Sequence, residues 1–413
     1  MTTTAIRRPG GDAHRSPAAR RSFDAVSLLT AYLVLLMAVP SAFVVGPLGA
    51  AGRPAGLFAL GLALIWVLNR FTPGRGVPAG PQPVRAIVIA FLVAVFAAYF
   101  AVASAPFRAG DLSAADRGIL LAVGLVGVTL LVVDARVDRD RIVVLLRRVV
   151  VGGEAMALVG MAQFLAGFDV FRYVRFPGLT LNHEYVAFYH DTGFRRVAST
   201  AGHPIEFGAV MAMVLPLALH FAFFSEPEHR RRRWAGVGLI AVAIPMSLSR
   251  SAVLGVTVGL AVLLLSWTPQ QRKRVLMALP VFLVGVRLMI PGLLGTIVSA
   301  FQHISSDPSF RGRNERRALV GHYIAAHPYF GMGFGTFDPV KYVLLDNAYV
   351  GTTVELGYVG LTVLLLFFAV GFFCARGARR LAPDPRARDL AGALAASIVV
   401  PAVEFVTFDA FAY

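Results

Sequence analysis

The chain is poor in cysteine, in acidic residues and in repeated segments. Cys374 is the only cysteine among 413 residues, so no intramolecular disulfide can form and a cysteine-rich metal site is excluded. Only 23 acidic residues stand against 39 lysines and arginines, which gives a formal net charge of +16. No internal repeat is evident, so nothing in the sequence supports a transporter built from inverted repeats.

Charged residues are scarce as well, and apolar residues take their place. Charged residues make up 15% of the chain, whereas 57% of its residues are hydrophobic and the mean hydropathy is +0.69. A soluble domain of this size could not bury so much apolar surface, so the bilayer must serve as its solvent. In a soluble protein the positive charge would suggest nucleic acid, but here it indicates loops that face a negatively charged inner leaflet. We expect a protein that contacts membrane lipids and binds no nucleic acid.

About eleven apolar stretches (ten to twelve) are candidates for transmembrane helices, since one crossing needs about 17–25 residues. They cover approximately residues 25–48, 56–71, 84–105, 116–135, 145–168, 204–224, 234–249, 251–267, 275–297, 348–374 and 389–411. Ser247, Ser249, Arg250 and Ser251 interrupt the apolar run 234–267, so we predict two short helices that meet there at a turn on the outer surface. The sequence therefore predicts an all-α, polytopic membrane protein.

The first 23 residues are polar and rich in arginine, which predicts a disordered cytoplasmic tail at residues 1–23. The apolar stretch that follows is too long for a signal-peptide core and lacks a convincing cleavage site, so we predict a first transmembrane helix. Residues 24–413 then form a single transmembrane domain.

Positive charge is concentrated in every second loop. These loops carry Arg70, Arg75, Arg85, Arg136, Arg139, Arg141, Arg230 to Arg233, Arg272, Lys273, Arg274, Arg376, Arg379, Arg380, Arg386 and Arg388. The positive-inside rule places them, and the N-terminus, in the cytoplasm. The remaining loops face outward, and the two longest lie at about 169–203 and 298–347, the second of them a large helical extracytoplasmic loop.

Several arginines nevertheless fall on the predicted outer side. They are Arg195, Arg196, Arg250, Arg311, Arg313, Arg316 and Arg317. The positive-inside rule disfavours arginine in outward-facing loops, so we expect these arginines to have a functional role. We expect them to bind an anionic substrate that is attached to the membrane.

The first outer segment begins with Arg195 and Arg196 and leads directly into a predicted helix. Pro204 suits the first helical turn, and Thr200 or Ser199 could cap it. A helix N-terminus supplies free amide donors and partial positive charge, so arginines just ahead of it suit phosphate oxygens. The alternative is that the arginines contact lipid headgroups.

His203 and Glu206 follow in the same segment and could share one face of the helix. A metal site needs at least a third ligand, and none can be identified, so structural hydrogen bonding is the better interpretation and no metal is expected.

Arg250 lies between two apolar half-spans, where a charge is costly unless it is paired or hydrated. We predict that it lines a cavity that opens outward. The alternative is an arginine at a helix end that extends its side chain to the interface.

The large outer loop contains an amphipathic pattern at 313–326. Arg313 and Arg317 share one face of the predicted helix, which His327 and Pro328 should end. Gly331, Gly333 and Gly335 predict a tight turn, although glycine alternation without a Walker lysine is weak evidence for phosphate binding. The alternative is a surface helix that rests on headgroups.

The loop closes at Asp346 and Asn347 and re-enters the membrane with Tyr349 and Glu355. Asp346 could simply cap the next helix, and as a lone signal the cap is the better interpretation.

Three acids, Glu154, Glu355 and Glu404, fall inside apolar stretches, where such residues usually face the bundle interior and find partners. Arg287 is a natural partner for one of them. We predict buried structural pairs more often than catalytic groups.

Four pieces of this sequence resemble the O-antigen ligase and O-antigen polymerase family of bacterial membrane glycosyltransferases. The pieces are Arg196-Val197-Ala198-Ser199-Thr200, Ser247-Leu248-Ser249-Arg250-Ser251, Arg313 with His327-Pro328-Tyr329-Phe330-Gly331-Met332-Gly333-Phe334-Gly335-Thr336-Phe337, and Asp346-Asn347-Ala348-Tyr349 with Glu355-Leu356-Gly357 and Gly360. Their order, spacing and shared outward placement carry the resemblance, which covers roughly residues 190–365.

The resemblance implies an enzyme with a GT-C-like arrangement of helices in the bacterial inner (cytoplasmic) membrane. Such proteins transfer a glycan from an undecaprenyl diphosphate-linked donor on the outer leaflet to an acceptor hydroxyl, without a metal, nucleotide or other cofactor. Other polysaccharide-assembly proteins are conceivable partners. The acceptor is another lipid-linked glycan in polymerases and a lipid core sugar in ligases.

The resemblance also suggests roles for individual residues. Arg196 and Arg250 would stabilise the departing diphosphate, and Asp346 would be the general base. The remaining residues expected to contact the diphosphate or the glycan are Arg195, Arg313, Arg317, His203, Asn347, Tyr349 and Glu355.

The chain departs from the family pattern at two places. Ligases typically carry histidine where this chain has Asp346, which favours a polymerase of surface polysaccharide over a ligase. The chain also stops at Tyr413, where members commonly have another helix, so we expect a shortened variant with altered stability and activity. A transporter or flippase for the same lipid-linked glycan, and a non-catalytic membrane scaffold, are further alternatives.

Overall fold

The computed structural model describes residues 24–72, 80–104, 110–135, 137–168, 171, 173–181, 188–190, 194–302, 320–338, 341–342, 345–409 and 411. Its helices are α1 (Ala25–Ala38), η1 (Gly46–Gly52), α2 (Pro54–Arg70), α3 (Pro83–Ala103), α4 (Asp111–Asp134), α5 (Arg139–Ala166), α6 (Pro204–Phe223), α7 (Pro227–Met246), α8 (Arg250–Ser266), α9 (Pro269–Met289), α10 (Leu293–Gln302), a short helix at 320–326, α12 (Ala348–Leu381) and α13 (Pro385–Glu404). The short strands are β1 (Phe43–Val44), β2 (Thr180–Leu181), β3 (Phe188–His190) and β4 (Arg195–Val197). The predicted tail at 1–23 lies outside the described residues.

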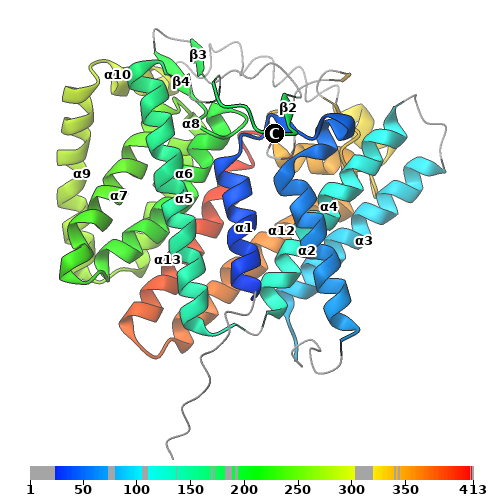
Figure 1. The fold of residues 1–413 in the computed structure, drawn as a ribbon, viewed down its shortest axis with the longest axis horizontal. Helices are drawn as coiled ribbons and strands as arrows, with labels where there is room; N and C mark the ends of the chain where they lie inside the picture. Colours follow the sequence, from blue (N-terminus) through cyan, green and yellow to red (C-terminus); the bar gives the residue numbers. More distant parts are fainter. Residues whose placement is uncertain are drawn as a thin grey trace, which may run out of the picture.

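A helix occupies each of the predicted apolar stretches, so the all-α membrane class is confirmed (Figure 1). Among the described residues, 4 helices are each long and apolar enough to cross a membrane, or up to 6 if each bent pair is one span. Two further apolar helices, α1 and α8, are shorter. The number of crossings and the GT-C-like class therefore stay predictions.

Two of the predicted stretches differ from the structure. The stretch 25–48 is helical only as far as Ala38, because Pro40 follows and disfavours the helical conformation at the residue before it. The stretch 275–297 is broken into α9 and α10, whose axes differ by 107°. Gly292 lies between them with a φ of 93°, a left-handed conformation that glycine adopts at little cost.

The interruption in the run 234–267 is a turn between two helices, as predicted. α7 ends at Met246 and α8 begins at Arg250. Ser249 is the N-cap of α8, and its side chain accepts a hydrogen bond from the amide of Ala252.

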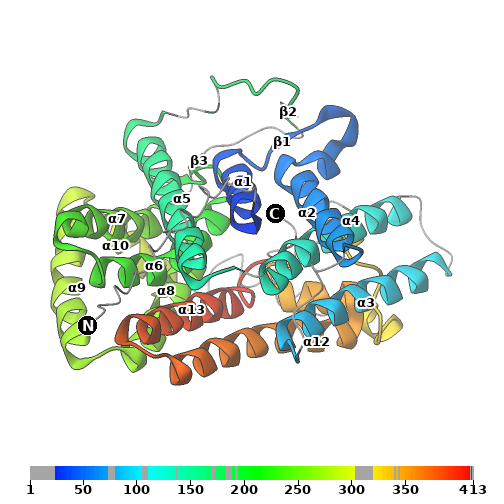
Figure 2. The ribbon, with the colours of Figure 1, turned by 60° about the horizontal axis from the view of Figure 1, so that its bottom comes forward.

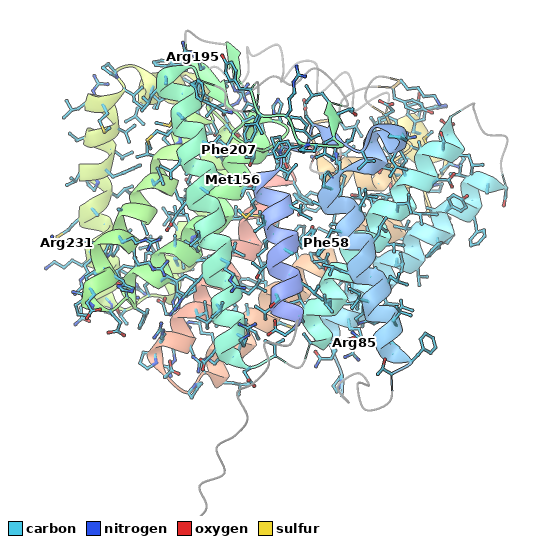
Figure 3. The ribbon with its side chains drawn as sticks, in the orientation of Figure 1. Phe58, Arg85, Met156, Arg195, Phe207 and Arg231 are labelled. Carbon is cyan, nitrogen blue, oxygen red and sulfur yellow. The ribbon has the colours of Figure 1, made fainter. Side chains whose placement is uncertain are left out.

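Polar contacts join the predicted cytoplasmic loops at one end of the bundle. They include ion pairs between Arg85 and Asp134, Arg141 and Asp24, and Arg139 and Asp384, the bonds from Gln271 and His220 to Asp389, and the bond from Arg379 to the carbonyl of Ser266. Figure 3 shows Arg85 and Arg231 at this end and Arg195 at the opposite one. Successive loops therefore lie at opposite ends of the bundle, as predicted. The side of the membrane that each end faces stays a prediction.

The opposite end is held by segments from several predicted outer loops. β1, which follows α1, pairs antiparallel with β2, which follows α5. An ion pair joins Lys341, which precedes α12, to Asp111 at the start of α4. These contacts bring distant parts of the sequence together above the helices (Figure 1).

The helices pack closely where glycine removes a side chain from the interface. A Cβ atom at Gly127 of α4 would lie 2.2 Å from the Cβ atom of Ala63 in α2, and one at Gly160 of α5 would lie 2.6 Å from the ring of Phe207 in α6. Phe207, Met211 and Ile240 are fully buried in the largest apolar cluster, which α5, α6, α7 and α8 share. α12 lies along α13 and α3 on another side of the bundle (Figure 2).

The contact at Gly127 leads to a stability prediction. Gly127→Val should lower the melting temperature of the purified protein in detergent, because overpacking a tight contact costs about 1–3 kcal/mol. Gly61→Val is the matched control, since a Cβ atom there has nothing within 4 Å. Equal melting temperatures for the two variants would show that α2 and α4 do not pack in this way.

Candidate functional site

The segment with Arg195 and Arg196 is a strand that leads into a buried turn. β4 pairs with β3, with Arg196 opposite Tyr189. The chain is fully buried at Val197, the last residue of β4, and at Ala198, and Ser199 has a left-handed φ of 56°. Both arginine side chains remain partly exposed at the end of the bundle.

Ser199 and Thr200 fasten this turn to two other helices. The amide of Ser199 donates to Oε1 of Gln163 at 2.8 Å, and its hydroxyl donates to the carbonyl of Met156 at 2.7 Å. The hydroxyl of Thr200 donates to the carbonyl of Met37 in α1 at 2.7 Å. The prediction that one of these residues caps α6 was wrong, because both hydroxyls are used by α1 and α5.

The N-cap of α6 is His203, and Pro204 is the first helical residue, as predicted. Nδ1 of His203 accepts from the amide of Ile205 at 3.2 Å, while Oε2 of Glu206 accepts from the amide of Gly202 at 2.8 Å. This reciprocal arrangement resembles a capping box, so both residues have the structural role that the sequence favoured.

Burial and the positive charge of Arg196 lower the pKa of His203 to about 4. His203 is therefore neutral near pH 7, with Nδ1 as acceptor. This effect on the pKa puts the guanidinium of Arg196 within electrostatic reach of His203, the N-cap of α6. Among the described residues, no group of three or more His, Cys, Asp and Glu side chains could hold a metal ion.

The turn that carries Arg250 packs against the start of α6. A Cβ atom at Gly208 would lie 2.6 Å from Oγ of Ser247 and 2.7 Å from Cβ of Ala252. Arg250, partly buried, begins α8 beside this contact. The structure thus brings the segments of Arg196 and Arg250 together around the first turns of α6.

The glycine-rich loop at 328–337 is inserted into a break in α12. The break is at Gly357, whose φ is 64° and ψ is −167°. The carbonyls of Val354 and Glu355 accept from the amides of Met332 and Gly333, both at 2.9 Å.

On the other side of the break, the amides of Tyr358 and Val359 donate to the carbonyls of Pro328 and Tyr329, at 2.8 and 3.3 Å. In an unbroken helix these two amides would bond to the carbonyls of residues 354 and 355. The loop therefore replaces the intrahelical hydrogen bonds. The glycine-rich loop and the Gly357 segment, which are separate pieces of the family pattern, form one structural unit.

Glu355 strengthens this unit. Its Oε1 accepts from the amide of Phe337 at 3.1 Å, and the amide of Gly335 also bonds to the carboxyl group. The side chain is buried, at 9% exposure. These contacts assign Glu355 a structural role, whereas its predicted contact with substrate has no test here.

Asn347, and not Asp346, caps α12. Oδ1 of Asn347 accepts from the amide of Val350 at 3.0 Å, and its Nδ2 donates to the carbonyl of Val406 at 3.0 Å. Asp346 precedes the cap with a left-handed φ of 49° and is partly buried. The interpretation of Asp346 as the cap was wrong, because Asn347 occupies that position.

Tyr349, in the first turn of α12, donates its hydroxyl to the carbonyl of Ala402 at 2.6 Å. Together with Asn347 it fastens the start of α12 to the end of α13. Its predicted contact with substrate stays a prediction.

The predicted contacts Arg313 and Arg317, with Arg311 and Arg316, lie outside the described residues. The helix at 320–326 ends just before His327 and Pro328, as predicted. Tyr323 of this helix packs against the rings of Phe337 and Tyr342, at centroid distances of 5.7 and 5.6 Å.

The acids in apolar stretches are not paired as predicted. Among the residues that the structure describes, Arg287 makes no ion pair with any of the three. Glu154 lies within electrostatic reach of Arg232 and Arg233 instead. Glu404 is fully buried, and neither of its carboxyl oxygens has a hydrogen-bond partner within the described part of the chain.

Two residues near the start of α6 were missed in the sequence. Gln163 is fully buried and holds Ser199, which no local pattern reveals. Arg53 is the N-cap of α2 and lies within electrostatic reach of Glu206. The positive-inside rule could have found Arg53, because it lies in the first predicted outer loop.

The apolar helical fold, with arginine-bearing segments gathered at one end, defines an integral membrane protein. Residues 235–365 match the model of a protein family described as O-antigen ligase. This match confirms the resemblance to the O-antigen ligase family for that part of the chain. It includes Arg250, the glycine-rich loop and Asp346, whereas Arg195, Arg196 and His203 precede it. No curated protein matches the chain.

The break in α12 leads to a second prediction. Gly357→Ala should displace the loop at 328–337, because a Cβ atom there would lie 2.2 Å from the carbonyl of Tyr329. The φ and ψ of Gly357 are also essentially restricted to glycine, and another residue there costs about 1–3 kcal/mol. Limited proteolysis should then cut the loop faster than in the native protein.

Gly377→Ala, in the same helix with nothing within 4 Å of its Cβ position, is the control and should leave the cleavage rate unchanged. A loop equally resistant in all three proteins would contradict the insertion.

Proposed function

We propose that this protein is a polymerase-type glycosyltransferase on the outer face of the bacterial cytoplasmic membrane. Its donor would be a glycan on undecaprenyl diphosphate, and its acceptor a hydroxyl of another lipid-linked glycan of a surface polysaccharide. The observation that carries the proposal is the packing of the Arg196 and Arg250 segments around the start of α6, at the end of the bundle opposite the cation-rich loops.

The arginines would meet the main energetic demand of the reaction. A glycan on a diphosphate is already activated, so the barrier arises chiefly from negative charge that develops on the departing diphosphate. Guanidinium groups remain charged at all relevant pH values and donate two parallel hydrogen bonds to phosphate oxygens. Arg196 and Arg250 would supply this stabilisation, with Arg195, Arg313 and Arg317 as further contacts.

The neutral state of His203 fits the same scheme. Because His203 is neutral near pH 7, the positive charge of this segment lies on Arg195 and Arg196. The arrangement keeps the positive charge on the arginine side chains, where it can be aimed at phosphate oxygens.

The second demand is removal of a proton from the acceptor. The hydroxyl oxygen attacks the anomeric carbon, the bond from that carbon to the diphosphate oxygen breaks, and the hydroxyl proton passes to a base. Asp346 is our candidate for this base, since it occupies the position at which ligases typically carry histidine, another side chain that can accept a proton. The products are the extended glycan and free undecaprenyl diphosphate, and the scheme requires no metal or other cofactor.

The third prediction tests the arginines. Arg196→Ala and Arg250→Ala should each lower polymer formation in cells by about a hundredfold to a thousandfold, which is the usual effect of removing one positioned donor. Arg231→Ala, at the opposite end of the bundle, is the control (Figure 3). Polymer of normal length and amount in both variants, at native protein levels in the membrane, would refute the proposal.

Asp346→Asn, measured in the same assay, tests the proposed base while it preserves the backbone conformation of this residue. Asparagine tolerates the left-handed conformation of this residue, so the variant removes the charge without strain. Loss of polymer is expected. Full activity would favour a transporter or flippase, which needs the arginines for headgroup binding but needs no base.

A ligase that transfers the whole glycan to a non-polyprenyl acceptor is the second candidate, and it is the activity that the description of the matching family names. Asp346, where ligases typically have histidine, argues for the polymerase. Transfer to a non-polyprenyl acceptor by the purified protein, without growth of the lipid-linked chain, would establish the ligase.

A further inference from the structure

A groove with a volume of about 430 Å³ runs between α1 and α5. Its walls are apolar apart from Thr30 and Arg148 at one end and Thr200 at the other. Val34 and Val151, at 57% and 45% exposure, leave its side open toward the lipid phase. Along α5 it extends from Arg148 to Val159, about 16 Å at 1.5 Å per residue, or half of a hydrocarbon core that is about 30 Å thick.

The two helices meet along the floor of this groove. A Cβ atom at Gly152 would lie 2.5 Å from Sδ of Met37, so glycine is what permits the close approach. At the inner end, Nη1 of Arg148 donates to the hydroxyl of Thr30 at 2.6 Å and joins the helices across the groove. The groove is thus built into the packing of α1 and α5, which lie side by side in Figures 1 and 2.

The outer end of the groove adjoins the arginine segment. Thr200 lines it and bonds to the carbonyl of Met37, and Ser199 bonds to the carbonyl of Met156. Met37 and Met156 are themselves wall residues of the groove. The turn that follows Arg196 therefore rests on the two helices that form the groove, and a lipid with its phosphates at the arginines would have its chain beside this opening.

We infer that the groove between α1 and α5 binds the polyprenyl chain of the lipid-linked donor, an inference that rests on the proposed function. Between its polar ends the groove is lined by apolar side chains, which suit a branched hydrocarbon, and each buried methylene contributes to binding. Adjacent arginines at one end suit the two phosphates of a diphosphate. The length of the groove suits a single hydrocarbon chain that lies in one leaflet, whereas a phospholipid has two chains.

Photo-crosslinking in native membranes tests this inference without requiring turnover. A benzophenone amino acid at position 155, which lines the groove, should form an adduct with the mass of undecaprenyl diphosphate or its glycan-bearing form. The same amino acid at position 158, equally lipid-facing on α5 but outside the groove, should not. A phospholipid adduct at position 155, or no adduct, overturns the inference.

A kinetic comparison distinguishes failure of the groove from failure of the transfer reaction. Ala155→Phe should raise KM for the undecaprenyl donor by about tenfold, since displacing two methylenes has about that effect, and leave KM unchanged for the same glycan on a diphosphate with two isoprene units. Leu158→Phe should alter neither value. If Ala155→Phe raises KM equally for both donors, the groove does not bind the polyprenyl chain, and the proposed function is unaffected. If position 155 forms the specific adduct but the protein transfers no glycan, the proposed function is wrong, and the groove inference is unaffected.

Discussion

The insertion of the glycine-rich loop into α12 is the interaction on which the candidate site depends. At Gly357 the helix leaves two carbonyls and two amides without intrahelical partners, in a part of α12 where Val354, Glu355 and Leu356 are buried in the protein. The loop at 328–337 satisfies all four groups with its own backbone, and Glu355 binds the loop from the helix side. The start of α12, with Asp346 just before it, is thereby fixed relative to the long outer loop. Discontinuous helices of this kind commonly form ligand sites in membrane proteins.

A second constraint arranges the remaining residues around that unit. The ion pairs of Asp24, Asp134 and Asp384 hold one end of the bundle. The connections at the other end carry the arginines of the predicted outer loops. There the start of α6 is the common support. β4 reaches it through the buried turn at Ser199, and the turn before α8 packs on Gly208. The same buried turn closes the groove between α1 and α5, so one short segment connects the proposed phosphate contacts with the lipid phase.

The positions of the helices could be predicted from hydropathy, and so could the turn before Arg250, because both depend on local composition. The caps were each misplaced, at α6 by three or four residues and at α12 by one, since the choice depends on backbone angles that distant partners impose. Ser199 is drawn away from α6 by Gln163 and Met156, which no local pattern reveals. The break at Gly357 was missed for the same reason. An isolated glycine in an apolar run does not reveal that a loop some 25 residues earlier supplies the hydrogen bonds that the helix loses there. The family match covers three of the four segments that carry the resemblance.

The most direct test of the account is reconstitution of the purified protein in liposomes with a defined glycan on undecaprenyl diphosphate. The measurement is the amount of free undecaprenyl diphosphate relative to new glycosidic bonds. We predict one molecule released for each bond formed, because the diphosphate leaves on its polyprenyl chain as the acceptor hydroxyl attacks. Donor that binds and crosses the bilayer with its diphosphate linkage intact would contradict the account and identify a transporter.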